Sequence, residues 1–258
     1  MRDQNQSALV TGGVQGLGAA AAKALADVGV TVAATHLGAG DRARAFADET
    51  GIPVFEWDVS EYDACTKGLK DVEEAIGPLD ILVNNAGNVI FEDIETVSTE
   101  HFRLHLDIHV MGTFFGCKYA LPLMKHRHKT IGGGGSSIVN MASTAALMGY
   151  GTIPAYTAAK GAISSMTRSI AMHCQDNEYG IRCNALAPGG IETPMVMGVS
   201  GRAGEAPMDI PEGPLPADAL GHPGDVAGCV LFLASDDARF LNGLTIPVDN
   251  GLDARPHH

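Results

Sequence analysis

The stretch Ser7-Ala8-Leu9-Val10-Thr11-Gly12-Gly13-Val14-Gln15-Gly16-Leu17-Gly18 decides the fold of this chain. Its first four residues predict a short apolar strand, and the alanine-rich run 19–28 after the turn predicts a helix. In the turn between them, Gly12 permits a tight bend, Gly16 lets backbone amides approach a pyrophosphate, and Gly18 lets the helix pack on the strand. A strand, a glycine-rich turn and a helix in this order predict a dinucleotide site at the helix N-terminus, rather than a turn without a ligand.

Strands and helices alternate along the rest of the chain. Apolar runs predict strands at residues 7–10, 30–34, 52–57, 79–83, 137–141, 181–186 and 244–248. Periodic runs predict helices at residues 19–28, 41–50, 61–76, 99–125 and 225–234, and one more after Pro154. This alternation implies right-handed crossovers, so we expect a single α/β domain over residues 1–258, a Rossmann-type doubly wound parallel sheet.

Residues 195–221 break the alternation. They are rich in Gly, Pro and Met, show poor periodicity, and leave the carboxyl end of an expected strand. Long loops at that end of a parallel sheet often cover ligands, so we expect a substrate lid there.

Composition limits the possible function classes. The 258 residues are 45% hydrophobic and 18% charged, which suits a globular protein with a sizeable core. A net charge of −13, from 17 Lys and Arg against 30 Asp and Glu, argues against nucleic acid or an anionic membrane as the main partner. We find no membrane-spanning apolar run and no secretory leader, and the five cysteines contain no Cys-x-x-Cys. A reducing cytoplasm is therefore the expected location.

Three residues between positions 143 and 160 can do chemistry together. Ser143 follows an expected strand, and Tyr156 and Lys160 stand four apart, on one face of an expected helix. An ammonium beside a phenol lowers the phenol's pKa from roughly 10, so the phenol can exchange a proton with an alcohol or ketone oxygen. The Ser143 hydroxyl can hold the same oxygen. Tyr-x-x-x-Lys pairs also occur on ordinary helix surfaces, so this interpretation depends on the glycine-rich turn upstream.

The end of the second strand bears on cofactor choice. An acidic residue there binds the adenosine ribose hydroxyls and favours NAD, but this chain has Thr35, His36 and Leu37. Arg42 and Arg44 come shortly after, either as part of a solvated helix face or as contacts to the 2′-phosphate of NADP. We therefore expect NAD(P), with a lean to NADP.

Three histidines recur every four residues on the helix expected at 99–125. His101, His105 and His109 form a stripe on one face, but no acid or cysteine obviously completes a metal site. Histidines on the surface or at a helix interface are the preferred interpretation, and no metal is expected.

Taken together, these features resemble the short-chain dehydrogenase/reductase family over nearly the whole chain. The matching motifs are Thr11-Gly12-x-x-x-Gly16-x-Gly18, Asp58-Val59, Asn84-Asn85-Ala86-Gly87, Ser143, Tyr156-x-x-x-Lys160 and Pro188-Gly189-x-Ile191-x-Thr193-Pro194. The resemblance implies an oxidoreductase that transfers a hydride between NAD(P) and a secondary alcohol or its ketone. It also implies a homotetramer.

The resemblance implies roles for the matching positions. Tyr156 would be the acid/base, Lys160 would lower its pKa and bind the nicotinamide ribose, and Ser143 would orient the substrate oxygen. Asp58 and Val59 would flank the adenine. The implied cofactor-binding residues are Gly12, Gln15, Gly16, Leu17, Gly18, His36, Asp58, Val59, Asn85, Ala86, Gly87, Tyr156, Lys160, Pro188, Gly189, Ile191 and Thr193, with the last two at the carboxamide end.

Two positions depart from the family pattern: His36 at the end of the second strand, described above, and His109. The family has an asparagine in a run like Asn-x-x-Gly-Thr, where this chain has His109-Val110-Met111-Gly112-Thr113. In the family that residue supports, largely through its backbone carbonyl, a water that relays protons to the lysine. A histidine keeps the carbonyl, so we count His109 among the catalytic residues and leave open what its imidazole does.

The two halves of the chain suggest different substrates. Residues 32–87 are similar to acetoacetyl-CoA reductases, and residues 173–197 to dehydrogenases of hydroxysteroids and alicyclic alcohols. Substrate residues lie mostly in the second half, which favours an alicyclic or steroid-like alcohol or ketone. A reductase of short acyl-CoA ketones would need cations near the pocket mouth, and the expected lid offers only Arg202. A non-catalytic dinucleotide-binding sensor or scaffold is the third alternative, against which the intact Ser143, Tyr156 and Lys160 argue.

Overall fold

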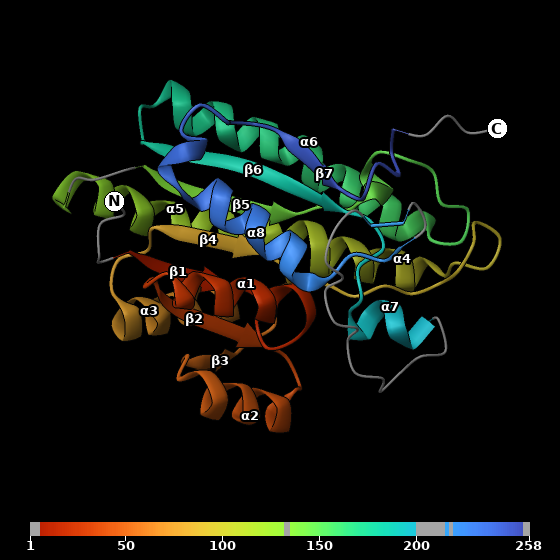
Figure 1. Cartoon of the computed structure of the whole chain (residues 1–258), viewed down its shortest axis with the longest axis horizontal. Helices are drawn as coiled ribbons and strands as arrows, with labels where there is room; N and C mark the ends of the chain where they lie inside the picture. Colours follow the sequence, from red (N-terminus) through yellow and green to blue (C-terminus); the bar gives the residue numbers. More distant parts are fainter. Residues whose placement is uncertain (1–5, 132–134, 200–214, 217–218, 255–258) are drawn as a thin grey trace.

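A computed structural model describes residues 6–131, 135–199, 215–216 and 219–254 of the chain. Seven strands form one sheet in the order β3-β2-β1-β4-β5-β6-β7, and every neighbouring pair is parallel (Figure 1). The strands are β1 (Ser7–Val10), β2 (Thr31–His36), β3 (Val54–Glu56), β4 (Ile81–Asn84), β5 (Ser136–Met141), β6 (Ile181–Pro188) and β7 (Thr245–Val248). The predicted doubly wound parallel sheet is confirmed.

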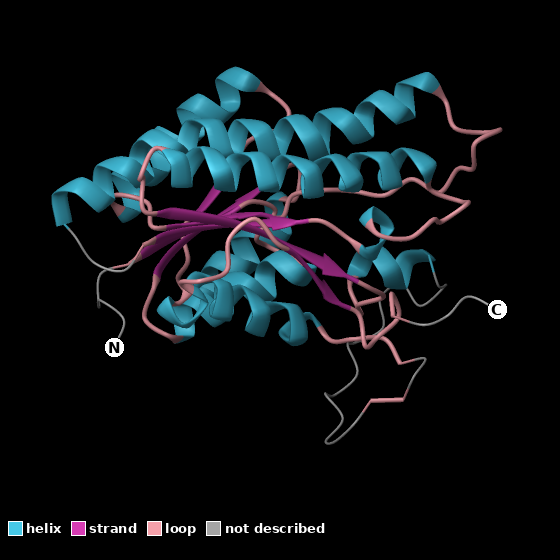
Figure 2. Ribbon diagram, turned by 90° about the horizontal axis from the view of Figure 1, so that it is seen from above, coloured by secondary structure: helices cyan, strands magenta, loops and turns pink. Residues whose placement is uncertain are grey.

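Helices cover both faces of the sheet (Figure 2). One apolar core lies under α1 (Gly16–Asp27), α2 (Gly40–Thr50) and α8 (Pro223–Ala234), and the other under α3 (Tyr62–Ile76), α5 (Gly112–Ile131) and α6 (Pro154–Asp176). Alternate residues of β1 enter opposite cores, since Ala8 and Val10 belong to the first and Leu9 to the second. Burial on both faces explains why the central strands read as continuous apolar runs.

The strand order predicts a ligand-binding crevice at the carboxyl ends of the central strands. The order reverses at β1, whose neighbours are β2 and β4, and ligands bind at such a switch point, outside the carboxyl ends of the strands. Hydrogen bonds tie these strand ends together. The Gly12 N–H donates to Thr35 Oγ1 at 3.1 Å, and Asn85 Nδ2 donates to the carbonyls of Thr11 and Gly12 at 3.0 and 3.1 Å. The turns that border the crevice are thereby held in one arrangement.

Helix α1 begins earlier than predicted. It starts at Gly16 rather than at residue 19, because its first turn contains two glycines, whose weak helix propensity conceals the start in the sequence. Tertiary packing selects glycine at Gly18, where an added Cβ would lie 2.3 Å from the Gly12 carbonyl oxygen. Close contact between helix and strand therefore outweighs local propensity.

The long helix predicted at 99–125 is present but is not uniform. It consists of α4 (Thr99–His105), a π-helical segment (Leu106–Met111) and α5, in which the Gly112 N–H donates to the carbonyl of Asp107, five residues back. Apolar periodicity does not distinguish one π turn inside a long helix from α-helix. His109 lies in this π-helical segment, and such segments frequently occur at functional sites.

The predicted lid at 195–221 includes part of a helix, which its Gly-, Pro- and Met-rich composition did not indicate. It overlaps helix α7 (Pro194–Val199), and most of the rest of that segment lies outside the described residues. Two short 3-10 helices, Thr144–Ala146 and Asp236–Ala238, complete the described elements. Within the described ranges, no helix combines the length and the hydrophobicity that crossing a membrane requires. All five cysteines are free thiols.

Candidate active site

Two adjoining cavities lie at the carboxyl ends of the strands. They share Gly12, Gln15, Ala86 and Gly87 in their linings. The predicted residues that line one or both are Gly12, Gln15, Gly16, Leu17, His36, Asp58, Val59, Asn85, Ala86, Gly87, Ser143, Tyr156, Pro188, Gly189, Ile191 and Thr193. Gly18, His109 and Lys160 line neither cavity, although each packs directly behind a wall residue. The sequence motifs therefore converge on one crevice.

The glycine-rich turn fits a dinucleotide pyrophosphate. Gly12 and Gly16 have φ of 62° and 52°, a conformation that favours glycine. A Cβ on Gly12 would lie 2.9 Å from the Ala86 Cα, so the two turns touch through backbone alone. Gly16 and Leu17 begin α1 and line the first cavity, where the first-turn N–H groups of a helix have no intrahelical acceptor. These donors and the helix dipole suit an anionic group.

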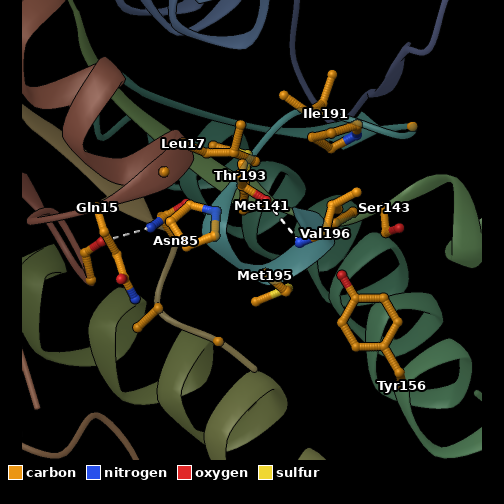
Figure 3. A pocket seen from close by; sticks show the side chains of 18 residues that line it. Gln15, Leu17, Asn85, Met141, Ser143, Tyr156, Ile191, Thr193, Met195 and Val196 are labelled. Carbon is orange, nitrogen blue, oxygen red and sulfur yellow. Dashed lines mark hydrogen bonds between the residues drawn. The ribbon is translucent and has the colours of Figure 1, made fainter. Parts of the chain in front are cut away.

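Ser143 and Tyr156 present their hydroxyls to the first cavity (Figure 3). Ser143 stands two residues after β5 and caps the following 3-10 turn, because its Oγ accepts a hydrogen bond from the Ala145 N–H at 3.1 Å. Tyr156 lies in the first turn of α6, which begins at Pro154, where the fixed φ of proline suits a helix start. A strand end and a helix start thus bring the two hydroxyls together.

Lys160 lies one turn after Tyr156 and is buried. Its Nζ donates to the Met141 carbonyl at 2.7 Å and lies 5.4 Å from the centroid of the Tyr156 ring. Burial lowers the pKa of Lys160 from 10.5 to about 7. The side chain is therefore close to the change between ammonium and amine at neutral pH.

The pKa of Tyr156 differs from the sequence expectation. Desolvation by the surrounding protein raises it from 10.0 to about 12, and the hydrogen bond with Ser143 lowers it only in part. We expected the Lys160 ammonium to lower this pKa. Burial is instead the largest cause of the shift, and burial also lowers the pKa of Lys160, which reduces the charge that Lys160 carries at neutral pH.

His109 lies beside Tyr156, outside the two cavities. Its buried ring stands perpendicular to the Tyr156 ring, at 88° with 5.3 Å between centroids, and its Nε2 donates to the Asn88 carbonyl at 2.8 Å. Burial, and next the charge of Lys160, lower the pKa of His109 well below 6.5. A titration of the imidazole near 6.5 is therefore not expected. Within the described ranges, no group of three or more His, Cys, Asp or Glu side chains is arranged to hold a metal.

The second cavity lies beside the end of β2. His36 lines it, and its Nδ1 accepts a hydrogen bond from the Ala39 N–H at 3.3 Å, which leaves Nε2 as the donor of a neutral ring. Arg42, on α2, donates to the side-chain oxygen of Gln15, a residue that lines both cavities. Arg44 instead pairs with Asp41 on the exposed side of α2. One of the two predicted arginines therefore lies at the rim of the crevice.

A family model described as Enoyl-(Acyl carrier protein) reductase matches residues 12–253. The chain belongs to the short-chain dehydrogenase/reductase family. An acetoacetyl-CoA reductase of Paracoccus denitrificans is 38% identical, over 95% of this chain and 96% of its own length. An NADP-dependent (R)-specific alcohol dehydrogenase of Lentilactobacillus kefiri is 34% identical, over 98% of this chain and 99% of its own.

A solved structure shows the same fold. The ligand-free aldohexose dehydrogenase of Thermoplasma acidophilum has a TM-score of 0.82 and 29% identity, over 100% of this chain and 96% of that one. The chain is thus an oxidoreductase of a family in which dependence on a nicotinamide nucleotide is typical, as predicted.

Several lining residues escaped the sequence analysis. They are Met141 and Ala142 in the first cavity, and Val14, Ala39, Trp57, Asn88 and Ile108 in the second, whereas Met195 and Val196 in the first cavity fall within the predicted lid. The helix that carries Met195 and Val196 could also have been predicted from the sequence, because Thr193 followed by Pro194 is typical of a helix start. Thr193 Oγ1 does accept a hydrogen bond from the Val196 N–H at 3.3 Å, which caps α7 (Figure 3). The others depend on tertiary packing and carry no local signature.

Proposed function

We propose that this oxidoreductase acts on a secondary alcohol or ketone with an apolar, alicyclic or steroid-like body. The observation that carries the proposal is the lining of the first cavity, where the Ser143 and Tyr156 hydroxyls lie among apolar side chains, including Met141, Met195 and Val196. Within the described part of that lining there is no lysine or arginine. Such a wall suits a hydrocarbon body whose one polar atom meets the two hydroxyls.

In this proposal Tyr156 transfers the proton. Its raised pKa keeps the phenol protonated at neutral pH, so it can donate to a ketone oxygen as negative charge develops there. The Ser143 hydroxyl donates a second hydrogen bond to that oxygen, which stabilises the same charge. A nicotinamide nucleotide supplies or accepts the hydride. Lys160, as an ammonium, would stabilise the phenolate left on Tyr156 and bind the nicotinamide ribose.

The two cavities give the nucleotide a path through the crevice. In our proposal its pyrophosphate lies at Gly12 and Gly16, and its adenine lies beside Asp58 and Val59. We favour NADP because the Arg42 guanidinium lies at the rim, and because His36 has a ring N–H to donate. The name of the Lentilactobacillus relative, an NADP-dependent enzyme, is consistent with this preference.

Replacement of Tyr156 by phenylalanine tests the proton transfer. Tyr156→Phe should retain the fold and nucleotide binding but lose about 10²–10⁴-fold in kcat, because only the proton donor is removed. Tyr179→Phe is the matched control, since Tyr179 lies in the turn between α6 and β6 and lines neither cavity. Near-full activity of Tyr156→Phe would show that another group transfers the proton.

A second candidate function is the reduction of acetoacetyl-CoA. It is favoured by the 38% identity to the Paracoccus enzyme, which bears that name. Comparison of kcat/KM for acetoacetyl-CoA with kcat/KM for cyclic and steroid ketones, with both nucleotides, separates the two candidates. Higher efficiency with acetoacetyl-CoA would reject our substrate class. Turnover of any ketone would exclude a non-catalytic sensor, which family membership and the Ser143, Tyr156 and Lys160 geometry already disfavour.

We further propose a cytoplasmic homotetramer. Exposed apolar side chains lie along the α4–α5 helix, at Leu104, Met111 and Phe114, and such a stripe is suited to pairing with a second copy. Five free thiols suit a reducing compartment.

A further inference from the structure

His105 and His109 connect parts of the chain that are far apart in sequence. Both side chains are buried, and their rings stack one helical turn apart, with 5.8 Å between centroids and 19° between planes. Each ring also meets the Tyr156 ring at nearly a right angle, His109 at 5.3 Å and His105 at 6.2 Å between centroids. The phenol ring of the site therefore rests against two imidazoles.

The same two histidines hold the backbone that follows β4. His109 Nε2 donates to the Asn88 carbonyl at 2.8 Å, and the Ile90 N–H donates to His105 Nε2 at 3.3 Å. Gly87 lies so close to His109 that an added Cβ would come within 2.5 Å of its Cε1. Since Gly87 and Asn88 line the cavities, the backbone held by the histidines is part of the crevice wall.

The hydrogen bond to His105 and the burial of His109 favour two neutral rings in opposite tautomers. His105 accepts at Nε2 and donates from Nδ1 to the His101 carbonyl at 2.9 Å, so its proton is on Nδ1. His109 donates from Nε2, and its Nδ1 is buried with no hydrogen-bond partner in the described part of the chain. Burial lowers the pKa of His109, so this Nδ1 carries no proton. Protonation would break the Ile90 bond or bury an unpaired N–H beside Lys160.

We propose that His105 and His109 are positioning residues that clamp residues 87–90 to the Tyr156 ring. The clamp keeps one wall of the nucleotide crevice at a fixed place relative to the Tyr156 phenol. The same two histidines therefore position both the bound nucleotide and the proton donor. The proposal rests on the proposed function in taking Tyr156 as the proton donor and NADPH as the nucleotide. The bonds to Asn88 and Ile90 act on nucleotide binding whether or not a ketone is reduced.

Amide exchange and nucleotide binding test the clamp in the full-length protein. His105→Ala should speed exchange of the Ile90 amide, and should raise the Kd of NADPH, each by about three- to tenfold, because one neutral hydrogen bond is lost. His105→Gln has an amide oxygen that can accept from Ile90, so it should restore part of both effects. His173→Gln, at an exposed position near the end of α6, should change neither.

Nitrogen NMR of the histidine rings provides a second measurement, which reads the tautomers in the parent protein and uses variants only to assign the signals. At neutral pH the ring of His105 should be protonated on Nδ1 only, and the ring of His109 on Nε2 only, with signals assigned through His105→Gln and His109→Gln. A cationic ring, equal tautomers, or unchanged Ile90 exchange in His105→Ala would overturn the clamp. A protein that protects Ile90 and binds NADPH but reduces no ketone would overturn the proposed function and leave the clamp standing.

Discussion

Replacement of Lys160 by methionine should make the nucleotide-free protein more stable at neutral pH, even though it removes a residue of the proposed site. The residue is 4% exposed, and burial lowers the pKa of its side chain from 10.5 to about 7. Between these two pH values the unfolded chain binds a proton that the folded chain does not, so stability rises with pH there. The difference corresponds to a cost of about 5 kcal/mol below pH 7, which falls to about 2 kcal/mol at pH 9.

Methionine removes that cost but introduces a smaller one. It has an unbranched, apolar side chain of similar length, so it can occupy the same space. It leaves the Met141 carbonyl without the donor that Lys160 Nζ provides at 2.7 Å, which costs about 1–3 kcal/mol. The expected net gain in the free energy of unfolding is about 2–4 kcal/mol at pH 6.5 and close to zero at pH 9.

Urea unfolding at both pH values measures the difference, at one protein concentration and without nucleotide, because assembly and ligands shift apparent stability. Lys70→Met on α3 is the control, since Lys70 is exposed and its replacement should leave the pH dependence unchanged. The Lys160→Met variant should also lose ketone reduction. Lower stability at pH 6.5, or a gain that persists at pH 9, would refute the argument from burial.

Three further predictions concern packing, cofactor choice and assembly. Gly18→Ala should weaken nucleotide binding and lower stability by about 1–3 kcal/mol, because its Cβ would lie 2.3 Å from the Gly12 carbonyl oxygen. Gly228→Ala, in α8 with no atom beyond its chain neighbours and the backbone of its own helix within 4 Å of the new Cβ, should instead raise stability by about 0.5–1 kcal/mol; urea unfolding of both variants checks this. The parent should prefer NADP in kcat/KM and His36→Asp should prefer NAD, whereas a parent that strongly prefers NAD would mean that no 2′-phosphate site exists. Sedimentation should show a tetramer at micromolar concentration, and a monomer would reject the proposed assembly.

The sequence by itself determined the fold class and the positions that gather at the crevice. The turn at Gly12 to Gly18 lies between an apolar strand and a helix, and such a unit is recognised from neighbouring residues alone. Tyr156 and Lys160 share a helix face because four residues make about one turn. Parallel strands bring their carboxyl ends to one edge, so Ser143 and the residues after β4 and β6 were expected near the same ligand.

Only the tertiary structure decided how those residues behave. The raised pKa of Tyr156 and the lowered pKa of Lys160 come from burial, which depends on atoms that are distant in sequence. His105 looked like one member of a helical stripe, but its ring accepts a hydrogen bond from Ile90, fifteen residues earlier, and faces Tyr156, on another helix. Arg42 likewise donates to Gln15, a residue 27 positions earlier that precedes another helix. Periodicity describes one element at a time, whereas protonation states and side-chain partners are set where elements meet.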